Sequence, residues 1–315
     1  MHTVVFLDRS SLGANVRAPG FAHSWRDHDR TAAAEVVNRL AGATIAVSNK
    51  VPLREAALAH LPQLRMIAVA ATGTDIVDLA ACRARGIVVS NIRNYATASL
   101  PEHVFALALA LRRNLIGYRN DVEHGLWQRA DTFCLLTYPI GDLAGSTLGL
   151  IGFGALGRSV AKLGLAFGMQ VIAYDPMPQA MPEVRMTDVD DILRRSDIVS
   201  LHLPLTEETR NLIGREELAR MKPGALLINT ARGGLVDEHA LADALRAGTI
   251  GGAGFDVLTM EPPPDDNPLL QLRQSNFILT PHVAWASAQA MQALADQLVD
   301  NIEAFVAGAP VNVVT

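Results

Sequence analysis

Cysteine is nearly absent from this sequence. The 315 residues include only Cys82 and Cys134, which lie far apart and lack the spacing of metal ligands. The scarcity excludes a disulfide framework and a cysteine-based metal site. Two isolated thiols are typical of a reducing compartment, so we predict a cytoplasmic protein without a metal centre.

Long apolar runs and a surplus of one charge are lacking as well. No uninterrupted apolar stretch reaches the roughly eighteen residues that a membrane span requires. The first residues, MHTVVFLD, lack the basic segment of a signal peptide. The formal net charge is −5, with acidic and basic residues interspersed. We therefore predict neither a membrane nor a nucleic-acid partner.

Hydrophobic residues, by contrast, make up half of the chain, which is enough to bury a large core. The length suits two domains. Short β-like runs alternate with helical segments in the first hundred residues, which predicts a parallel sheet covered by helices. Residues 15–29 show no pattern and are expected to form a loop. The strands are expected at 4–7, 44–47, 66–70 and 87–90.

The stretch 148–175 organises the rest of the chain. An apolar run leads into Gly152-x-Gly154-x-x-Gly157, a helical pattern follows, and a second apolar run ends on Asp175, eighteen residues after the last glycine. This order is typical of a dinucleotide site. Gly152 would make the tight turn, Gly154 would let the backbone approach the pyrophosphate, and Gly157 would let helix and strand pack closely.

The ends of these elements predict which dinucleotide binds. The helix start, at Ala155 and Leu156, would offer N–H groups and a positive dipole end to the phosphates. Asp175 is placed to accept hydrogen bonds from the adenosine ribose. A carboxylate there would repel a 2′-phosphate, and residues 176–181 contain no Arg or Lys to neutralise one. We therefore predict NAD rather than NADP; glycines that serve only helix packing are the alternative.

More strands and two long helices are predicted around this turn. Ser99 and Glu102 have the spacing of a capping box at the start of a long apolar helix. The stretch 125–146 is either a packed loop or a segment that reaches a partner subunit. A last helix over 287–307 is expected to cover the first domain. Four more strands are expected, at 198–203, 225–229, 253–258 and 277–280. Together with the two strands beside the glycine turn they make six, the number in a full dinucleotide-binding sheet.

Hydride transfer to a carbonyl compound requires a group that binds the substrate and a proton donor beside it. Arg232, in INTARGG after a strand, offers a fork of donors that matches a carboxylate or a keto oxygen. His282, in TPHVAW after the last strand, is the residue type that exchanges protons near neutral pH. Glu261, before a run of prolines, would orient the imidazole and stabilise its charged form. Each residue also has a purely structural interpretation.

Four motifs in order, GFGALG, INTARGG, GFDVLTMEPP and TPHVAW, resemble the D-2-hydroxyacid dehydrogenase family over nearly the whole chain. The resemblance implies that Arg232, Glu261 and His282 are the catalytic triad. His202, in the HLPLT strand, is interpreted as strand packing at the adenine side. The resemblance also implies further cofactor contacts: Pro204, Thr206, Thr230, Ala231, Asp256 and His282.

In the first domain, AATGTD matches the family's loop whose backbone N–H groups hold the substrate carboxylate. That match implicates four residues: Ala71, Thr72, Gly73 and Thr74. Taken alone, the loop is equally typical of a helix start. Lys50, in SNKVPL, is either a second carboxylate contact or a solvated residue. Trp285, with SNKVPL and NIRNYATASLPEH, resembles the glycerate dehydrogenase or hydroxypyruvate reductase branch, and its indole would either limit substrate size or pack on the last helix.

These patterns predict an α/β protein with two doubly wound parallel-sheet domains. A Rossmann NAD-binding domain (99–285) would be inserted into a smaller flavodoxin-like substrate domain (1–98 and 286–315). The resemblance implies an NAD-dependent homodimeric oxidoreductase that interconverts a small 2-oxo acid, hydroxypyruvate or glyoxylate, and its D-2-hydroxy acid. A D-lactate-like or broader 2-oxo acid reductase, or a non-enzymatic NAD sensor on the same scaffold, are the alternatives.

Overall fold

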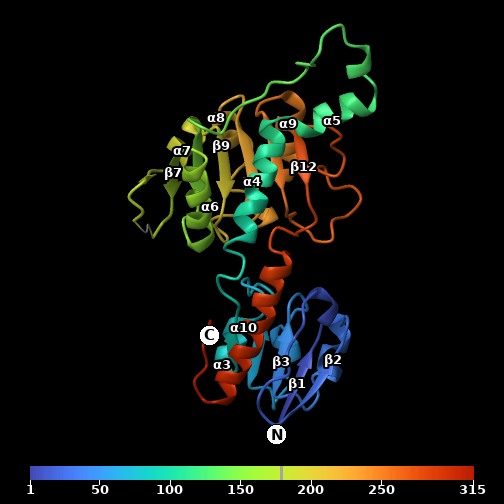
Figure 1. Cartoon of the computed structure of the whole chain (residues 1–315). Helices are drawn as coiled ribbons and strands as arrows, with labels where there is room; N and C mark the ends of the chain where they lie inside the picture. Colours follow the sequence, from blue (N-terminus) through green and yellow to red (C-terminus); the bar gives the residue numbers. More distant parts are fainter. Residues whose placement is uncertain (178–179) are drawn as a thin grey trace. The chain divides into compact units, whose positions relative to one another are not determined.

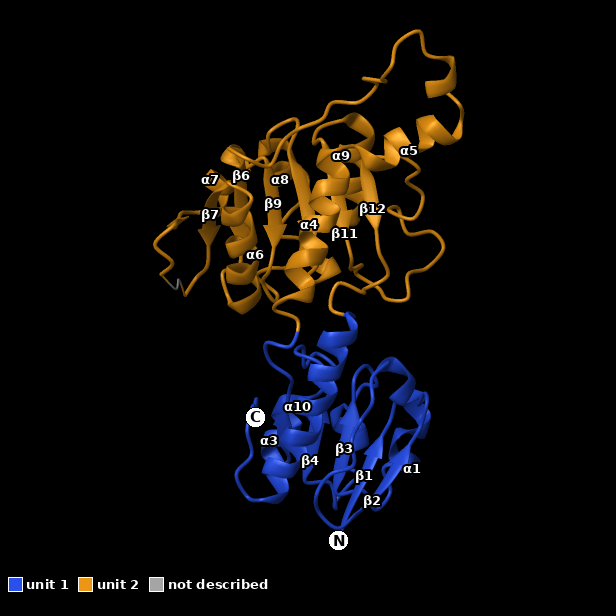
Figure 2. Ribbon diagram, in the orientation of Figure 1, with its two compact units in different colours: residues 1–95, 286–315 blue, residues 96–285 orange. Residues whose placement is uncertain are grey.

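The computed structural model describes residues 1–177 and 180–315. The chain divides into two compact units, one made of residues 1–95 and 286–315 and the other of residues 96–285 (Figure 2). The chain leaves the first unit after residue 95 and returns to it at residue 286. The second unit is therefore an insertion into the first.

The first unit is built on a five-stranded parallel sheet (Figure 1). Its strands are β1 His2–Phe6, β2 His23–Asp27, β3 Ile45–Ser48, β4 Met66–Val69 and β5 Val88–Ser90. The spatial order, β2-β1-β3-β4-β5, is the doubly wound order of flavodoxin-like domains. Every residue of β3 and β4 is buried, as expected where helices cover both faces of a parallel sheet.

A long C-terminal helix packs on this sheet. α10, Ala288–Val306, contacts β4, and the Ser287 hydroxyl caps its start by accepting a hydrogen bond from the Ala290 N–H. The other helices of this unit are short, so the sheet and α10 supply most of its framework. They are α1 Val36–Arg39, α2 Glu55–Leu58 and α3 Leu79–Ala84, with single 3₁₀ turns η1 Arg9–Ser11 and η2 Ala33–Glu35.

The second unit is built on a seven-stranded parallel sheet. Its strands are β6 Thr147–Ile151, β7 Gln170–Tyr174, β8 Val184–Met186, β9 Ile198–Leu201, β10 Leu226–Asn229, β11 Gly252–Phe255 and β12 Phe277–Leu279. Their order is β12-β11-β10-β9-β6-β7-β8. The winding reverses between β6 and β9, and doubly wound sheets bind ligands at the carboxyl ends of strands at such a point. The predicted fold class, α/β with two doubly wound parallel sheets, is confirmed.

Helices cover this second sheet. α4, Ser99–Arg112, packs against β10, β11 and α6, Ala155–Ala166, and the rings of Phe105 and Phe167 stack 5.0 Å apart. Within the described residues, no helix combines the length and apolar character that crossing a membrane requires. The remaining helical segments are α5 Leu115–Glu123, η3 Trp127–Arg129, α7 Val189–Arg195, α8 Arg215–Arg220, η4 Gly233–Leu235 and α9 Glu238–Ala247.

Two edge strands were missed by sequence reasoning. The prediction that residues 15–29 form only a loop is wrong, because β2 pairs with β1. The prediction of six strands in the second sheet is also wrong, because β8 adds a seventh beside β7. No residue of β2 is buried, and only one of the three residues of β8 is. Neither edge strand therefore carries the apolar pattern on which strand prediction depends.

Ser99 does not cap α4, contrary to the capping-box prediction. The N-cap is Ala98, and no side chain caps the helix there. The buried Ser99 hydroxyl instead donates a hydrogen bond to the carbonyl oxygen of Ala284, at 2.7 Å. The start of α4 is therefore tied to the segment that follows β12.

An ion-pair cluster ties the loop before β2 to α10. Arg17 lies 2.7 Å from Glu303 Oε2 and 2.6 Å from Asp300 Oδ1. The Gly20 N–H also donates to Glu303, at 2.6 Å. Hydrogen bonds from Arg17 and then Gly20 lower the pKa of Glu303 from its ordinary 4.5 to about 2.

We expect Glu303→Gln to lower the free energy of unfolding by about 0.5–1 kcal/mol at neutral pH, the range for partly exposed ion pairs. Because the folded-state pKa of Glu303 lies below its unfolded value, the stabilisation is complete well above pH 4.5 and is lost as the pH falls from 4.5 to about 2. Urea unfolding of the wild type and the variant should therefore give converging stabilities towards low pH. A gap that stays constant over this range would contradict the assignment.

Candidate active site

The glycine turn connects β6 to α6. Gly152 has a φ of 98°, and a side chain there would overlap the backbone carbonyl of His202. A Cβ on Gly157 would overlap the carbonyl oxygen of Gly152, so the helix start packs directly on the turn. Gly154 is exposed, and apart from its immediate neighbours in sequence no heavy atom of the described residues comes within 4 Å of where its Cβ would lie. The turn therefore presents an open backbone face at the start of α6, beside half-buried Ala155 and Leu156.

Asp175, directly after β7, is tied to this turn. Its Oδ2 accepts from the Phe153 N–H at 2.7 Å and its Oδ1 from the Met177 N–H at 2.9 Å. A carboxylate oxygen can accept two hydrogen bonds, so each oxygen retains acceptor capacity for a hydroxyl group. The stretch 176–181, on which the preference for NAD over NADP was predicted, includes residues 178 and 179, which lie outside the described residues.

Two further side chains, those of Arg158 and His202, lie beside the glycine turn. Arg158, in the first turn of α6, donates to the Phe153 carbonyl at 3.1 Å, which puts a cation at a helix end suited to phosphate. Sequence reasoning did not single out Arg158. His202 lies 2.9 Å from the Ser200 hydroxyl, and burial lowers its pKa to about 4. His202 is therefore neutral at physiological pH and packs behind the turn.

The segments after β9 and β10 carry other predicted cofactor contacts. Pro204 and Thr206 are exposed in a turn held by Thr209, whose hydroxyl accepts from the Thr206 N–H at 2.7 Å and donates to the Pro204 carbonyl at 2.8 Å. The Thr230 hydroxyl is buried and has no hydrogen-bond partner among the described residues. A buried, unpaired hydroxyl costs free energy, so Thr230 fits a site that a bound molecule completes.

Asn229, the last residue of β10, shapes the turn that carries Arg232. Its side chain accepts from the Ala231 N–H at 3.1 Å and donates to the Arg232 carbonyl at 2.9 Å. Gly233 lies so close to the chain after β11 that a Cβ would overlap the backbone of Leu258. The Arg232 turn is therefore packed directly against the segment that leads to Glu261.

Glu261 and His282 are brought together by the segments that follow β11 and β12. Glu261 Oε2 lies 2.6 Å from His282 Nδ1, and Glu261 Oε1 accepts from the Leu258 N–H at 2.9 Å. The side chains of His282 and Glu261 are 27% and 34% exposed. Because the carboxylate holds the ring at Nδ1, Nε2 is the nitrogen able to exchange a proton with a substrate. Since β10, β11 and β12 are neighbours, Arg232, Glu261 and His282 follow three adjacent strands at one edge of the sheet.

Asp256 and Trp285 hold the backbone around His282. Asp256 is 1% exposed and accepts from the N–H groups of Val283 and Ala284 at 2.9 and 2.8 Å. The indole N–H of Trp285 donates to the His282 carbonyl at 2.9 Å. Asp256 therefore caps this turn, and the Trp285 side chain folds back on it.

In the first unit, the loop 71–74 follows β4. The Thr72 hydroxyl donates to the Ile92 carbonyl at 2.8 Å, and the Asn91 side chain donates to the Thr72 carbonyl at 2.7 Å. The next helix, α3, begins only at Leu79, so the loop is not a helix start. The segment after β5 therefore holds this loop at the carboxyl end of the sheet.

Lys50 is exposed in the turn after β3. Asp8, which follows β1 and is 6% exposed, accepts from the N–H groups of Asn49 and Lys50 at 3.0 and 2.6 Å. Burial raises the pKa of Asp8, and these backbone hydrogen bonds oppose the rise. Asp8 was not identified from the sequence, although its position after an apolar run in VVFLD is typical of a strand end.

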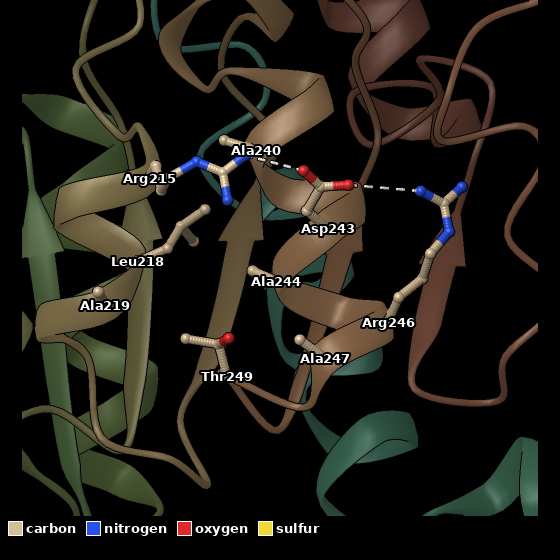
Figure 3. A pocket seen from close by; sticks show the side chains of 9 residues that line it. All are labelled: Arg215, Leu218, Ala219, Ala240, Asp243, Ala244, Arg246, Ala247 and Thr249. Atoms are coloured by element: carbon tan, nitrogen blue, oxygen red, sulfur yellow. Dashed lines mark hydrogen bonds and ion pairs between the residues drawn. The ribbon is translucent and has the colours of Figure 1, made fainter.

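A separate hollow of about 520 Å³ lies between α8 and α9 (Figure 3). Leu218 and Ala244 contribute to its apolar wall, and Asp243 stands at its rim between Arg215 and Arg246, at N···O distances of 2.8 and 3.7 Å. The residues that line it include none of the predicted site residues. The hollow is therefore not the candidate active site.

Comparison with known proteins gives a consistent relationship. The model of the "D-isomer specific 2-hydroxyacid dehydrogenase, NAD binding domain" family matches residues 105–284. The chain is 57% identical over 312 residues to a glycerate dehydrogenase of Methylorubrum extorquens, covering 99% of this chain and 98% of the relative. It is 38% identical over 294 residues to a hydroxypyruvate reductase of Blautia hydrogenotrophica, covering 91% and 90%.

A solved structure agrees with these sequence matches. The D-lactate dehydrogenase from Aquifex aeolicus, complexed with NAD and lactic acid, superimposes with a TM-score of 0.82 at 31% identity, covering 97% of this chain and 96% of that one. The matched family domain lies within the unit that carries the glycine turn, Asp175 and the Glu261–His282 pair. The predicted family and the predicted cofactor, NAD, are confirmed. The chain belongs to the D-isomer specific 2-hydroxyacid dehydrogenase family.

Proposed function

We propose that this chain interconverts a small 2-oxo acid and its 2-hydroxy acid with NAD as the hydride carrier. The pair is hydroxypyruvate and the D-2-hydroxy acid D-glycerate, or glyoxylate and achiral glycolate. The observation that carries the proposal is the Glu261–His282 pair, 2.6 Å apart in the NAD-binding unit and joined through Leu258 to the Arg232 turn. The names of the relatives support the substrate class, because one is a glycerate dehydrogenase and another a hydroxypyruvate reductase.

The cofactor site in this proposal is the open face of the glycine turn. NAD, when bound, supplies or accepts the hydride. The backbone of Gly154, Ala155 and Leu156 would hold the pyrophosphate at the positive end of the α6 dipole. Asp175 would accept hydrogen bonds from the ribose hydroxyls. Five further residues complete the cofactor contacts that we propose: Pro204, Thr206, Thr230, Ala231 and Asp256.

The proton and the substrate are handled by the three residues after β10, β11 and β12. Arg232 binds the carboxylate and keto oxygen with its fork of N–H donors. His282 Nε2 donates its proton to the keto oxygen as the keto carbon is reduced. The keto oxygen becomes the hydroxyl group of the product, and the imidazole is left neutral. Glu261 keeps the ring oriented through Nδ1. In the oxidising direction His282 takes the same proton back.

We infer that the first unit is the substrate domain. The backbone N–H groups of its loop 71–74 and the ammonium group of Lys50 would bind the substrate carboxylate. Trp285, whose indole folds back on the His282 turn, would limit the size of the substrate side chain. We also infer a cytoplasmic location, supported by the unpaired thiols of Cys82 and Cys134.

The test of this function is an assay of NADH oxidation by the purified chain with hydroxypyruvate, glyoxylate and pyruvate. The proposal predicts turnover with the first two acids and a lower kcat/KM with pyruvate. A preference for pyruvate would favour a D-lactate-like or broad 2-oxo acid reductase. NADH binding without oxidation in the presence of any of the three acids would favour a non-enzymatic NAD sensor.

Asp175→Ser should reduce the preference for NAD over NADP. The substitution removes the charge that would repel a 2′-phosphate, and it also removes the acceptor of the Phe153 and Met177 N–H bonds. We expect the ratio of kcat/KM for NADH to that for NADPH to fall about tenfold or more, since loss of one close charge repulsion is worth about 1.4 kcal/mol or more. An unchanged ratio would show that another group sets the selectivity.

We propose further that the chain forms a homodimer through an apolar arm of the second unit, residues 115–146. Figure 2 shows α5 and the loop after it extending away from the sheet of that unit. Phe133 and Leu136 are 91% and 83% exposed, and Trp127 is 52% exposed. The arm is nevertheless ordered, because Tyr118 and Tyr138 meet edge to face and the Tyr118 hydroxyl donates to the Tyr138 carbonyl at 2.7 Å. An ordered apolar surface of this kind is typical of a subunit interface.

The dimer is tested by measuring the molar mass in solution. The wild type should give twice the chain mass, and the double variant Phe133→Ser, Leu136→Ser should give the mass of one chain. Met177→Ser is a matched control, because Met177 is also highly exposed in the second unit but lies outside the arm. A wild type that is monomeric at assay concentration would refute the interface.

A further inference from the structure

The backbone of His282 is held in an unusual conformation by the elements around it. Its φ is 57°, in the left-handed region that a non-glycine residue adopts only when its surroundings impose it. The imposing contacts come from two places. Asp256 binds the next two N–H groups, and Ser99 at the start of α4 binds the Ala284 carbonyl.

A third contact reaches this turn from α4. His103 Nε2 lies 3.0 Å from the Thr280 hydroxyl oxygen, and that oxygen lies 2.5 Å from Asp256 Oδ1. His103 Nε2 is also 3.7 Å from the same carboxylate oxygen. The three side chains therefore form a connected row that ends on the carboxylate capping the His282 turn.

The direction of the hydrogen bonds in this row follows from the chemistry of its members. An ionised carboxylate only accepts, so the Thr280 hydroxyl donates its single proton to Asp256. The Thr280 oxygen then accepts from His103, which must carry a proton on Nε2. Each hydrogen bond in this row polarises the next one. The hydrogen bond from His103 therefore strengthens the one that Thr280 donates to the Asp256 carboxylate, which is 1% exposed.

We propose that His103 and Thr280 are positioning residues for His282. They orient the Asp256 carboxylate, which fixes the backbone of residues 282–284 and so keeps His282 Nδ1 on Glu261. This inference rests on the proposed role of His282 as the proton donor. It gives α4 a role in positioning His282, in addition to its role in the hydrophobic core.

The test uses pairs of variants that remove or retain one hydrogen bond. Thr280→Val keeps the shape of the side chain and removes the hydroxyl, whereas Thr280→Ser keeps the hydroxyl. His103→Phe removes the Nε2 donor, whereas His103→Gln keeps an N–H donor on a side chain of similar reach. We expect kcat with hydroxypyruvate, measured at saturating NADH, to fall about tenfold or more in the first member of each pair. The second member should recover most of kcat.

A second readout does not depend on turnover. The His282 Nδ1 proton shared with Glu261 should give a low-field proton NMR signal, identified by its loss in His282→Ala. The signal should weaken or shift in Thr280→Val and persist in Thr280→Ser. If the wild type has no activity but the signal responds in this way, the proposed function is wrong and the positioning role stands.

The inference is overturned by either of two results. The first is an active wild type in which Thr280→Val and His103→Phe both keep kcat within about twofold of the wild-type value and leave the NMR signal unchanged. Alternatively, all four variants could lose NADH affinity and turnover together, with no recovery in the conservative member of each pair. The second result would mean that the row of side chains only stabilises the fold.

Discussion

Replacement of His282 by alanine is expected to lower kcat with hydroxypyruvate by about 10² to 10⁴, the contribution typical of a positioned proton donor. The imidazole is the one group in the proposal that transfers a proton, and Glu261 holds it at Nδ1 at 2.6 Å. Its removal leaves the glycine turn and Asp175 untouched. The dissociation constant of NADH should therefore stay within about twofold of the wild-type value.

The measurement is a steady-state assay at saturating NADH, paired with a fluorescence titration of NADH binding. His239→Ala is the matched control, since His239 is an exposed histidine in the first turn of α9 in the same unit. The control should behave as the wild type in both experiments. Near-normal turnover of His282→Ala would contradict the acid–base assignment, while loss of NADH binding would show that the variant disturbs the cofactor site.

Gly233→Ala is expected to abolish most activity even though the added group is a single methyl. A Cβ at this position would overlap the backbone of Leu258, which cannot move as a flexible side chain end can. The Leu258 N–H binds Glu261, so relief of the overlap must separate the Arg232 turn from the Glu261–His282 pair. Overpacking of this kind costs about 1–3 kcal/mol or more, and displacement of a catalytic group by about 1 Å can cost about a hundredfold in rate.

Gly224→Ala provides the comparison. Gly224 lies in the same unit, and apart from its immediate neighbours in sequence no heavy atom of the described residues comes within 4 Å of where its Cβ would lie. Thermal unfolding and kcat should both be close to wild type in this control. A Gly233→Ala enzyme with wild-type kcat would show that the two turns are not mechanically coupled.

The elements predicted well from the sequence include the strands that are buried throughout. β3, β4, β9 and β10 are buried at every residue, so their apolar runs were visible without any tertiary information. The edge strands β2 and β8 were missed for the opposite reason, because only one of their eight residues is buried. The role of Ser99 was also misread, because its partner, Ala284, is distant in the sequence.

The candidate site divides in the same way. The glycine turn and the order of Arg232, Glu261 and His282 are local patterns, and the structure brings the latter two into direct contact. Two kinds of residue support them. Asn229 shapes the Arg232 turn by hydrogen bonds to residues two and three positions later, which is a local turn pattern. His103 instead reaches Thr280 across 177 positions of sequence, and such a contact is set by tertiary packing, so one sequence carries no periodic signal for it.

Hydride transfer from NADH to the 2-oxo acid can be followed directly with a deuterium label. The purified chain is incubated with hydroxypyruvate and NADH that carries deuterium on the transferable position of the nicotinamide ring, and the product is analysed for isotope and configuration. We expect D-glycerate with deuterium on the hydroxyl-bearing carbon next to the carboxylate. L-glycerate, glycerate without deuterium, or NADH that remains unoxidised while bound to the chain would contradict the proposed function.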